Sequence, residues 1–206
     1  VNVTLVDPVT DEPIANATVI VTLPNGTNVT GKTDVNGTVE IPVDIPVGPN
    51  TLNVTYPGNE TFNGTSTTVV VDVGQRNSTT VAVVANNTAG NVTIDVNVTD
   101  SVTGEAVPNG PVEVYANGTL VGSGSIVDGK ATIDNVDITS NGTYDIVVKY
   151  MGNENYTDSS CPVGDIVVVG RESNITADMT NTTFGNTTVN VTLVDPVTDE
   201  PIANAT

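Results

Sequence analysis

Apolar and polar residues alternate in short runs along most of this chain. In Val1–Leu5 every second residue is Val or Leu, the pattern of a β-strand with one buried face. Runs of the same kind follow at Ala17–Leu23, Val39–Val43, Leu52–Tyr56 and Val69–Val73. Apolar residues spaced by three and four, as an amphipathic helix needs, do not persist anywhere. The pattern predicts an all-β protein whose alternate apolar residues point inward.

Turn residues separate these runs at spacings near ten residues. Pro24–Gly26 and Asp34–Gly37 have compositions that supply positive φ in tight turns. The second half has the same rhythm, and its apolar positions expected to face inward are Val81, Val83, Ile94, Val96, Val98, Val112, Val114, Ala131, Ile133, Tyr144, Ile146, Val148, Tyr150, Val167 and Val169. About six short strands in the first half and seven in the second predict immunoglobulin-like (Ig-like) β-sandwiches, with an up-and-down barrel as the alternative.

The chain repeats itself. Its first eighteen residues, VNVTLVDPVTDEPIANAT, return unchanged at 189–206, so the exact repeat spacing is 188 residues. A fainter copy that begins at Ile94 reduces the structural unit to about 94 residues, because it matches the opening at Val3, Asp7, Val9, Thr10, Glu12 and Asn16. We therefore expect an Ig-like repeat at 1–75 without its first strand, a complete repeat at 76–171, and the beginning of a next repeat at 172–206. On this interpretation the sequence is a window on a longer repeating chain.

Several strings in these strands and turns carry a resemblance to known families. VDPVTDEPIANATVIV followed by TDVNGTVEI is similar to bacterial Ig-like domains of the invasin and intimin type. YPGNETF and YMGNENY resemble the last hairpin of related tandem Ig-like repeats. With its many Asn-Xaa-Thr triplets, the whole chain resembles the adhesin-like surface proteins of methanogenic archaea. The resemblance implies tandem Ig-like domains at an extracellular cell surface.

Charge and the rare residue types argue against several functions. Five basic against 24 acidic residues give a formal net charge of -19, which repels nucleic-acid phosphates and anionic lipids. With no His and one Cys, neither a Ser-His-Asp nor a Cys-His arrangement can be built. A carboxylate pair for glycoside hydrolysis would normally be accompanied by aromatic platforms, and aromatic residues make up only 3% of the chain. We expect no enzyme activity, no nucleic-acid partner and, since no apolar run approaches ~18 residues, no membrane span in this window.

Cys161 and the lysines are candidates for covalent cross-links. Cys161 has no partner for an internal disulfide, and Thr67 replaces it in the other repeat, so we expect a half-buried thiol rather than a bridge between chains. A Lys–Asn isopeptide bond needs a buried Lys, Asn and acid together. Lys32 and Lys130 fall at expected turns and Lys149 at an outward position, which argues against such a bond.

N-glycosylation signals are the strongest candidate chemistry. Of the 25 Asn residues, 20 begin an Asn-Xaa-Ser/Thr triplet, against about five expected by chance. In strands these triplets put Asn and Thr on the outer face and Val in the core, and Asn is a poor strand former whose use needs a reason. The alternative is that Asn and Thr are neutral polar filler. We expect N-linked glycans, and no other cofactor, at Asn2, Asn16, Asn25, Asn28, Asn36, Asn53, Asn59, Asn63, Asn77, Asn86, Asn91, Asn97, Asn117, Asn141, Asn155, Asn174, Asn181, Asn186, Asn190 and Asn204.

Acidic loops are the candidate for a metal site. Asp7, Asp11 and Glu12, with Asp100 and Glu105 in the matching loop, could gather oxygen ligands for calcium. No Asp-Xaa-Asp-Xaa-Asp-Gly loop supports a calcium site. The expected role is that of solvated turn carboxylates that keep the protein soluble, with no bound metal.

These features lead to a structural hypothesis with a binding alternative. We expect the stalk or fibre segment of a long, N-glycosylated, adhesin-like cell-surface protein, joined to further copies by self-association or by continuation of the same chain. The alternative is that the repeats themselves bind glycans or proteins of a host or neighbouring cell. A binding face needs exposed aromatic or Arg anchors, and only Arg76 and Arg171, both at repeat junctions, qualify.

Overall fold

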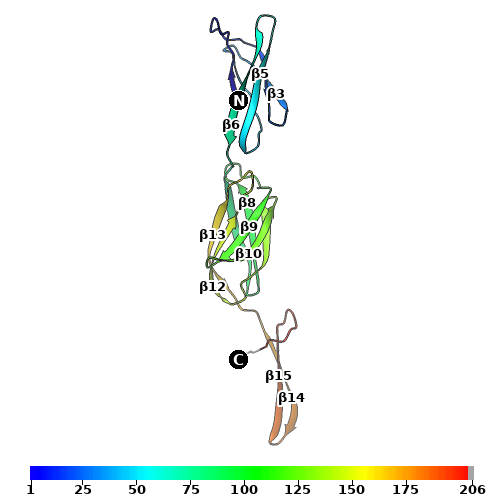
Figure 1. Ribbon diagram of the computed structural model, residues 1–206. Coiled ribbons are helices and arrows are strands. Elements are labelled where there is room, and N and C mark those ends of the chain that lie inside the picture. Colours follow the sequence, from blue (N-terminus) through cyan, green and yellow to red (C-terminus); the bar gives the residue numbers. More distant parts are fainter. Residues whose placement is uncertain (204–206) are drawn as a thin grey trace. The chain divides into compact units, whose positions relative to one another are not determined.

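Figure 1 shows the computed structural model, which describes residues 1–203, without the side chains of 181, 182 and 186. The contacts divide the chain into two compact units, Val1–Arg76 and Asn77–Thr206. Within residues 1–203 no helix is long and apolar enough to cross a membrane. The regular elements are strands, which confirms the all-β prediction: β1 (Asn2–Thr4), β2 (Thr18–Thr22), β3 (Asn28–Lys32), β4 (Thr38–Glu40), β5 (Gly48–Gly58), β6 (Asn63–Val73), β7 (Ser78–Thr88), β8 (Asn91–Asp100), β9 (Asn109–Ala116), β10 (Thr119–Val127), β11 (Lys130–Val136), β12 (Gly142–Tyr150), β13 (Ser159–Val168), β14 (Asn174–Thr183) and β15 (Asn186–Val194).

The first unit is built from two small antiparallel sheets. One has the strand order β3-β2-β5-β6, and the other pairs β1 with β4. Alternate residues of β2 and β5 point inward, as their spacing predicts. The larger buried cluster of this unit consists of Val19, Val21, Leu23, Ile41, Leu52 and Val54, and half-buried residues such as Val1, Val3, Val39 and Val69 pack against it. A smaller cluster contains Ile14, Ala17 and Tyr56.

The second unit contains a seven-stranded sandwich with the strand order β13-β12-β9-β10-β11-β8-β7. Strand β10 pairs with β9 along most of its length but meets β11 at one register pair, Val127 with Lys130. The sheet therefore folds over at β10 into two layers (Figure 1). Strands β8 and β11, and β9 and β12, are neighbours although they are not consecutive, as in an Ig-like sandwich. The Ig-like prediction is confirmed, and the up-and-down barrel is wrong because it would pair consecutive strands.

Strand β7 reverses the predicted inner face. Val81 is 52% and Val83 57% exposed, whereas Ser78 and Thr80 are buried. The Oγ atom of Ser159 on β13 lies 2.7 Å from the hydroxyl oxygens of both Ser78 and Thr80. Because these hydroxyl groups satisfy one another between β7 and β13, the polar face of β7 can be buried. The prediction of an inward orientation is therefore wrong for Val81 and Val83, and it is also wrong for the exposed Val167 and Val169.

Strands β14 and β15 form an antiparallel hairpin with the register of β7 and β8. Met179 pairs with Val189, as Val84 pairs with Ile94, and an irregularity in register follows each pair. Residues 95 positions apart therefore correspond in the two hairpins. The division of the sequence into three repeats stays a prediction.

Candidate functional site: glycosylation acceptors

Sixteen of the twenty predicted acceptor Asn residues have exposed side chains. Asn86 is half-buried, Asn204 lies outside the described residues, and the side chains of Asn181 and Asn186 are not described. Exposure is a steric requirement for glycosylation, and occupancy stays a prediction. The exposed acceptors are Asn2, Asn16, Asn25, Asn28, Asn36, Asn53, Asn59, Asn63, Asn77, Asn91, Asn97, Asn117, Asn141, Asn155, Asn174 and Asn190.

The one buried Asn among the described side chains stands outside these triplets. Asn50 is 5% exposed, and its Nδ2 donates hydrogen bonds of 2.8 Å to the carbonyl oxygens of Pro46 and Gly48. This side chain fixes the start of β5 by satisfying two backbone acceptors. Structural Asn and candidate acceptor Asn are thus different residues.

Acceptors on strands follow the alternation of the sheet. Asn53 is exposed, and the next residue, Val54, is in the core. In the backbone register Thr22 pairs with Asn28 on one side and with Asn53 on the other. Because neighbouring strands are about 4.8 Å apart, these two acceptors share one outer face at a separation of about 10 Å.

Acceptors in turns use their side-chain oxygen to hold the turn. The Oδ1 atom of Asn25 accepts the N–H of Thr27 at 2.9 Å, and that of Asn59 accepts the N–H of Thr61 at 2.8 Å. Neither Nδ2 atom donates a hydrogen bond within the described part of the chain. Nδ2 is the atom to which an N-glycan is joined, so the turn geometry leaves the reactive end of the side chain accessible.

Asn86 and Asn91 form a reciprocal pair of triplets on the hairpin of β7 and β8. Asn86 pairs with Thr93, and Thr88 pairs with Asn91. The Oδ1 atom of Asn86 accepts the N–H of Thr88 at 2.8 Å. Since Asn86 is half-buried, it is the least accessible of the acceptors whose side chains are described.

The acidic turns use their carboxylates as backbone hydrogen-bond acceptors. The Oδ1 atom of Asp7 accepts the N–H of Val9 at 2.9 Å, and that of Asp100 accepts the N–H groups of Val102 and Thr103 at 2.8 and 3.0 Å. In residues 1–203 no three Cys, Asp or Glu side chains lie together as a metal site would require. This geometry explains Asp7 and Asp100 as turn formers, and the expectation that no calcium is bound stays a prediction.

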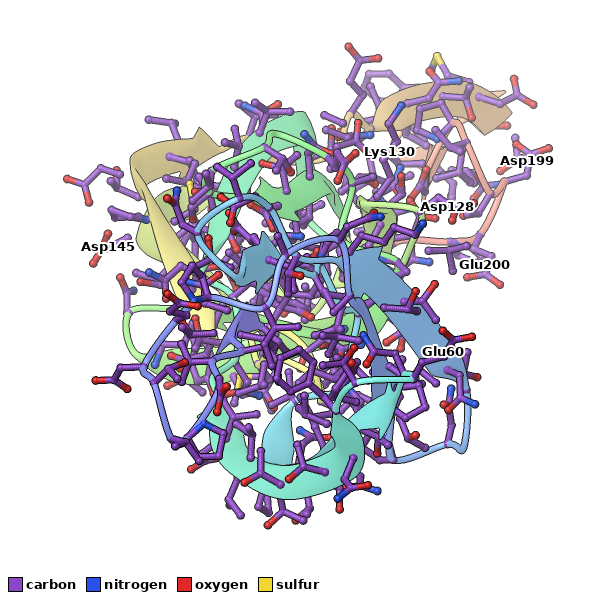
Figure 2. All side chains as sticks on the ribbon, turned by 90° about the horizontal axis from the view of Figure 1, so that it is seen from above. Glu60, Asp128, Lys130, Asp145, Asp199 and Glu200 are labelled. Atoms are coloured by element: carbon purple, nitrogen blue, oxygen red, sulfur yellow. The ribbon has the colours of Figure 1, made fainter. Side chains whose placement is uncertain are left out.

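Most charged side chains are exposed, whereas Asp100 and Asp195 are buried. Figure 2 shows Glu60, Lys130 and Asp145 pointing outward. Lys32, Lys130 and Lys149 are all exposed. These lysines lack the buried surroundings that an isopeptide bond needs.

Cys161 and Arg171 also have defined surroundings. Cys161 is a free, half-buried thiol that packs against the core of the sandwich. The Nη2 atom of Arg171 lies 3.1 Å from Oδ2 of Asp195, and the two side chains are 45% and 11% exposed. Arg171 is therefore engaged in an ion pair within the second unit.

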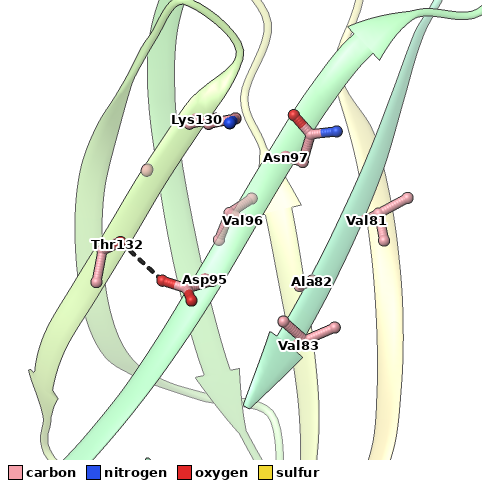
Figure 3. Close-up of a pocket in the computed structure, with 9 residues that line it drawn as sticks. Val81, Ala82, Val83, Asp95, Val96, Asn97, Lys130 and Thr132 are labelled. Atoms are coloured by element: carbon pink, nitrogen blue, oxygen red, sulfur yellow. Dashed lines mark hydrogen bonds between the residues drawn. The ribbon is translucent and has the colours of Figure 1, made fainter. Parts of the chain in front are cut away.

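A shallow depression of about 360 Å³, which was not predicted from the sequence, lies on the outer face of β7, β8 and β11 (Figure 3). It was missed because Val81 and Val83 were expected in the core. The available signal was the row of small hydroxyl residues, Ser78 and Thr80, that alternates with these valines. The depression contains one predicted acceptor, Asn97.

The sequence of the sandwich matches the model of a known protein family. Residues 77–169 match the family model described as bacterial Ig-like domain (group 3). No curated protein matches the chain. Domains of this family are common in extracellular and surface proteins and are typically not enzymes. The matched range covers β7 to β13, the strands whose Ig-like order is described above, so the sequence match and the strand order of these residues agree.

Proposed function

We propose that this chain is a structural segment of an N-glycosylated, adhesin-like protein at the cell surface, in which Ig-like repeats form a stalk or fibre. The two units have separate buried cores, one around Val21 and Leu52 and the other around Ile94 and Ile146. A repeat that buries its own core can be copied without new contacts elsewhere, so the molecule gains length by duplication. The exact return of the first eighteen residues at 189–206 supports such copying.

Glycans would protect the sheet edges of such a fibre. Strands β3 and β6 are the edges of the four-stranded sheet, and they carry the exposed acceptors Asn28 and Asn63. Unprotected edges pair with other chains. Sugar at these residues, together with the net charge of -19, would oppose pairing between neighbouring fibres.

The glycoprotein proposal rests on one observation: the described acceptor Asn side chains are exposed or half-buried, whereas Asn50, which is outside the triplets, is buried. Glycopeptide mass spectrometry of native protein tests the proposal. We expect glycans at several acceptors, and unmodified Asn throughout would overturn the proposal.

Single-molecule stretching tests the stalk role. Repeats that unfold one at a time should lengthen the chain in equal steps of about 30 nm, given about 94 residues at ~3.4 Å each. Binding of the chain to a glycan array would instead favour the adhesion alternative.

A further inference from the structure

Two exposed valines lie beside an acceptor Asn on the outer face of the sandwich. In the register of β7 and β8, Val81 is directly opposite Asn97, and Val83 is opposite Asp95. Figure 3 shows Val81 and Asn97 on neighbouring strands, with Val83 further along β7. Because side chains at i and i+2 share one face, Val81 and Val83 form an apolar stripe next to Asn97.

Polar groups border this stripe on the side of β11. Lys130 pairs with Asn97, and Thr132 pairs with Asp95. The hydroxyl of Thr132 donates a hydrogen bond of 2.7 Å to Oδ1 of Asp95. The depression therefore combines apolar methyl groups with a carboxylate and an ammonium group. The C–H face of a sugar ring can pack against the methyl groups, and its hydroxyl groups can form hydrogen bonds with the two charged groups.

We propose that the N-linked glycan of Asn97 folds back over β7, so that its first sugars cover Val81 and Val83. Directly opposed Cβ atoms in an antiparallel pair are about 5 Å apart, so a sugar joined to Nδ2 of Asn97 is within contact distance of the Val81 methyl groups. Covering the stripe removes apolar surface from water. The inference rests on the proposed glycosylation and names the surface that this glycan occupies.

The corresponding hairpin of β14 and β15 provides an internal comparison. Residue Asn97 corresponds to Thr192, which cannot carry an N-glycan, and Val81 corresponds to Thr176. Asn190, an exposed acceptor of that hairpin, lies opposite Asp178. At the position of Val81, therefore, a valine stands opposite the acceptor Asn97 in one hairpin, and Thr176 stands opposite Thr192 in the other.

The direct test is nuclear Overhauser spectroscopy on the full chain, produced in an N-glycosylating host with labelled valine methyl groups. We expect contacts from sugar ring protons to the methyl groups of Val81 and Val83. Asn28 is the control acceptor because it lies on the edge strand β3, its register partner is Thr22 and its diagonal neighbour on β2 is Ile20, so no valine faces it. Its glycan should show no valine contact.

Thermal unfolding gives an independent test. In the glycosylated chain, Asn97→Gln should lower the Tm of the sandwich by about 2–4 °C, and Thr99→Ala, which removes the glycan and keeps Asn97, should do the same. With Val81→Thr and Val83→Thr already in place, loss of the glycan should leave the Tm unchanged. In the unglycosylated chain, Asn97→Gln should change the Tm by the same small amount whether residues 81 and 83 are Val or have been changed to Thr.

Mass spectrometry of the Asn97 peptide separates the outcomes. This inference is overturned, and the proposed function left intact, if Asn97 carries a glycan that makes no contact with the valine methyl groups. The same holds if loss of that glycan lowers the Tm equally with and without the Val81→Thr and Val83→Thr changes. The same holds if Asn97 is unmodified while other acceptors carry sugar. If native protein carries no glycan at any Asn, both proposals fail.

Discussion

The hydroxyl of Tyr150 donates a 3.0 Å hydrogen bond to the backbone carbonyl of Asn109, whereas the hydroxyl of the corresponding Tyr56 is buried without a partner in the described structure. The neighbouring residue differs between the two repeats. A Cβ added to Gly110 would lie 2.7 Å from the Tyr150 hydroxyl oxygen, and the corresponding residue of the first unit is Ala17, which clusters with Tyr56. The two corresponding tyrosines therefore differ in hydrogen bonding, and the residue beside them differs by one methyl group, Gly110 beside Tyr150 and Ala17 beside Tyr56.

Replacing each tyrosine by Phe should separate these environments. Tyr150→Phe should lower the free energy of unfolding of the sandwich by about 1 kcal/mol, because it removes a satisfied hydrogen bond. Tyr56→Phe should leave the first unit unchanged or more stable, since a buried hydroxyl without a partner is destabilising. Urea unfolding of both full-length variants, followed by NMR signals from each unit, measures the difference. Equal losses in the two variants would mean that Tyr56 has a partner, such as an ordered water molecule.

Burial also makes Tyr150 sensitive to alkaline pH. Burial, with a smaller contribution from Tyr156, raises the pKa of Tyr150 above its ordinary value of 10.0. The neutral phenol therefore contributes stability that is fully present below about pH 10 and is lost as the pH rises through the pKa of the folded state. Tyr150→Phe should remove this part of the alkaline loss of Tm. A Tm that falls equally with pH in both proteins would contradict the prediction.

Gly110 should tolerate no side chain. Its φ is +138°, and an added Cβ would lie 2.4 Å from Cε2 of Tyr150. Gly110→Ala should lower the free energy of unfolding by about 2–4 kcal/mol through overpacking and backbone strain. Gly118→Ala is the control, because φ there is +81° but an added Cβ would meet no described atom within 4 Å. The control should lose only about 1 kcal/mol, and equal losses in a denaturant titration would show that packing against Tyr150 is unimportant.

Much of the fold could be predicted because core and surface alternate along the strands. Alternation places Leu52 and Val54 correctly, and Gly26 and Gly37 have the positive φ of predicted turns. The pattern fails at β7, where both faces contain residues small enough to be buried. Single-strand alternation cannot show that Ser159, some eighty residues away in sequence, satisfies the hydroxyl groups of Ser78 and Thr80. For the same reason the depression beside Asn97 could not be predicted: it depends on which face of β7 is buried.

Asp34 should give the first unit a sensitivity to acid. The backbone N–H of Thr38, followed by hydrogen bonds from the Thr38 hydroxyl and from Asn36, lowers the pKa of Asp34 below its ordinary value of 3.8. Its ionised form therefore contributes stability that is present above about pH 3.8 and is lost as the pH falls through the pKa of the folded state. An NMR titration of the Asp34 carboxyl carbon should show the lowered pKa. Thr38→Val, which removes the hydroxyl donor and keeps the backbone donor, should raise this pKa partway, and an unchanged midpoint would contradict the assignment.

The ion pair of Arg171 and Asp195 should restrain the segment that follows β13. Asp195 is 8% exposed, and its Oδ1 accepts the N–H of Val197 at 2.9 Å, so its other oxygen faces Arg171 from a fixed position. Because Arg171 is 45% exposed, the pair contributes less than about 1 kcal/mol, and its effect should be local. Arg171→Ala should lower the ¹⁵N order parameters of residues 170–172, whereas the neighbouring change Glu172→Gln should not. Sodium chloride at high concentration should reproduce part of the loss, because salt screens a partly exposed pair. Order parameters that stay the same in Arg171→Ala would show that this segment is held by its backbone contacts, such as the hydrogen bond from Ala89 N–H to the carbonyl of Val169, and not by the ion pair.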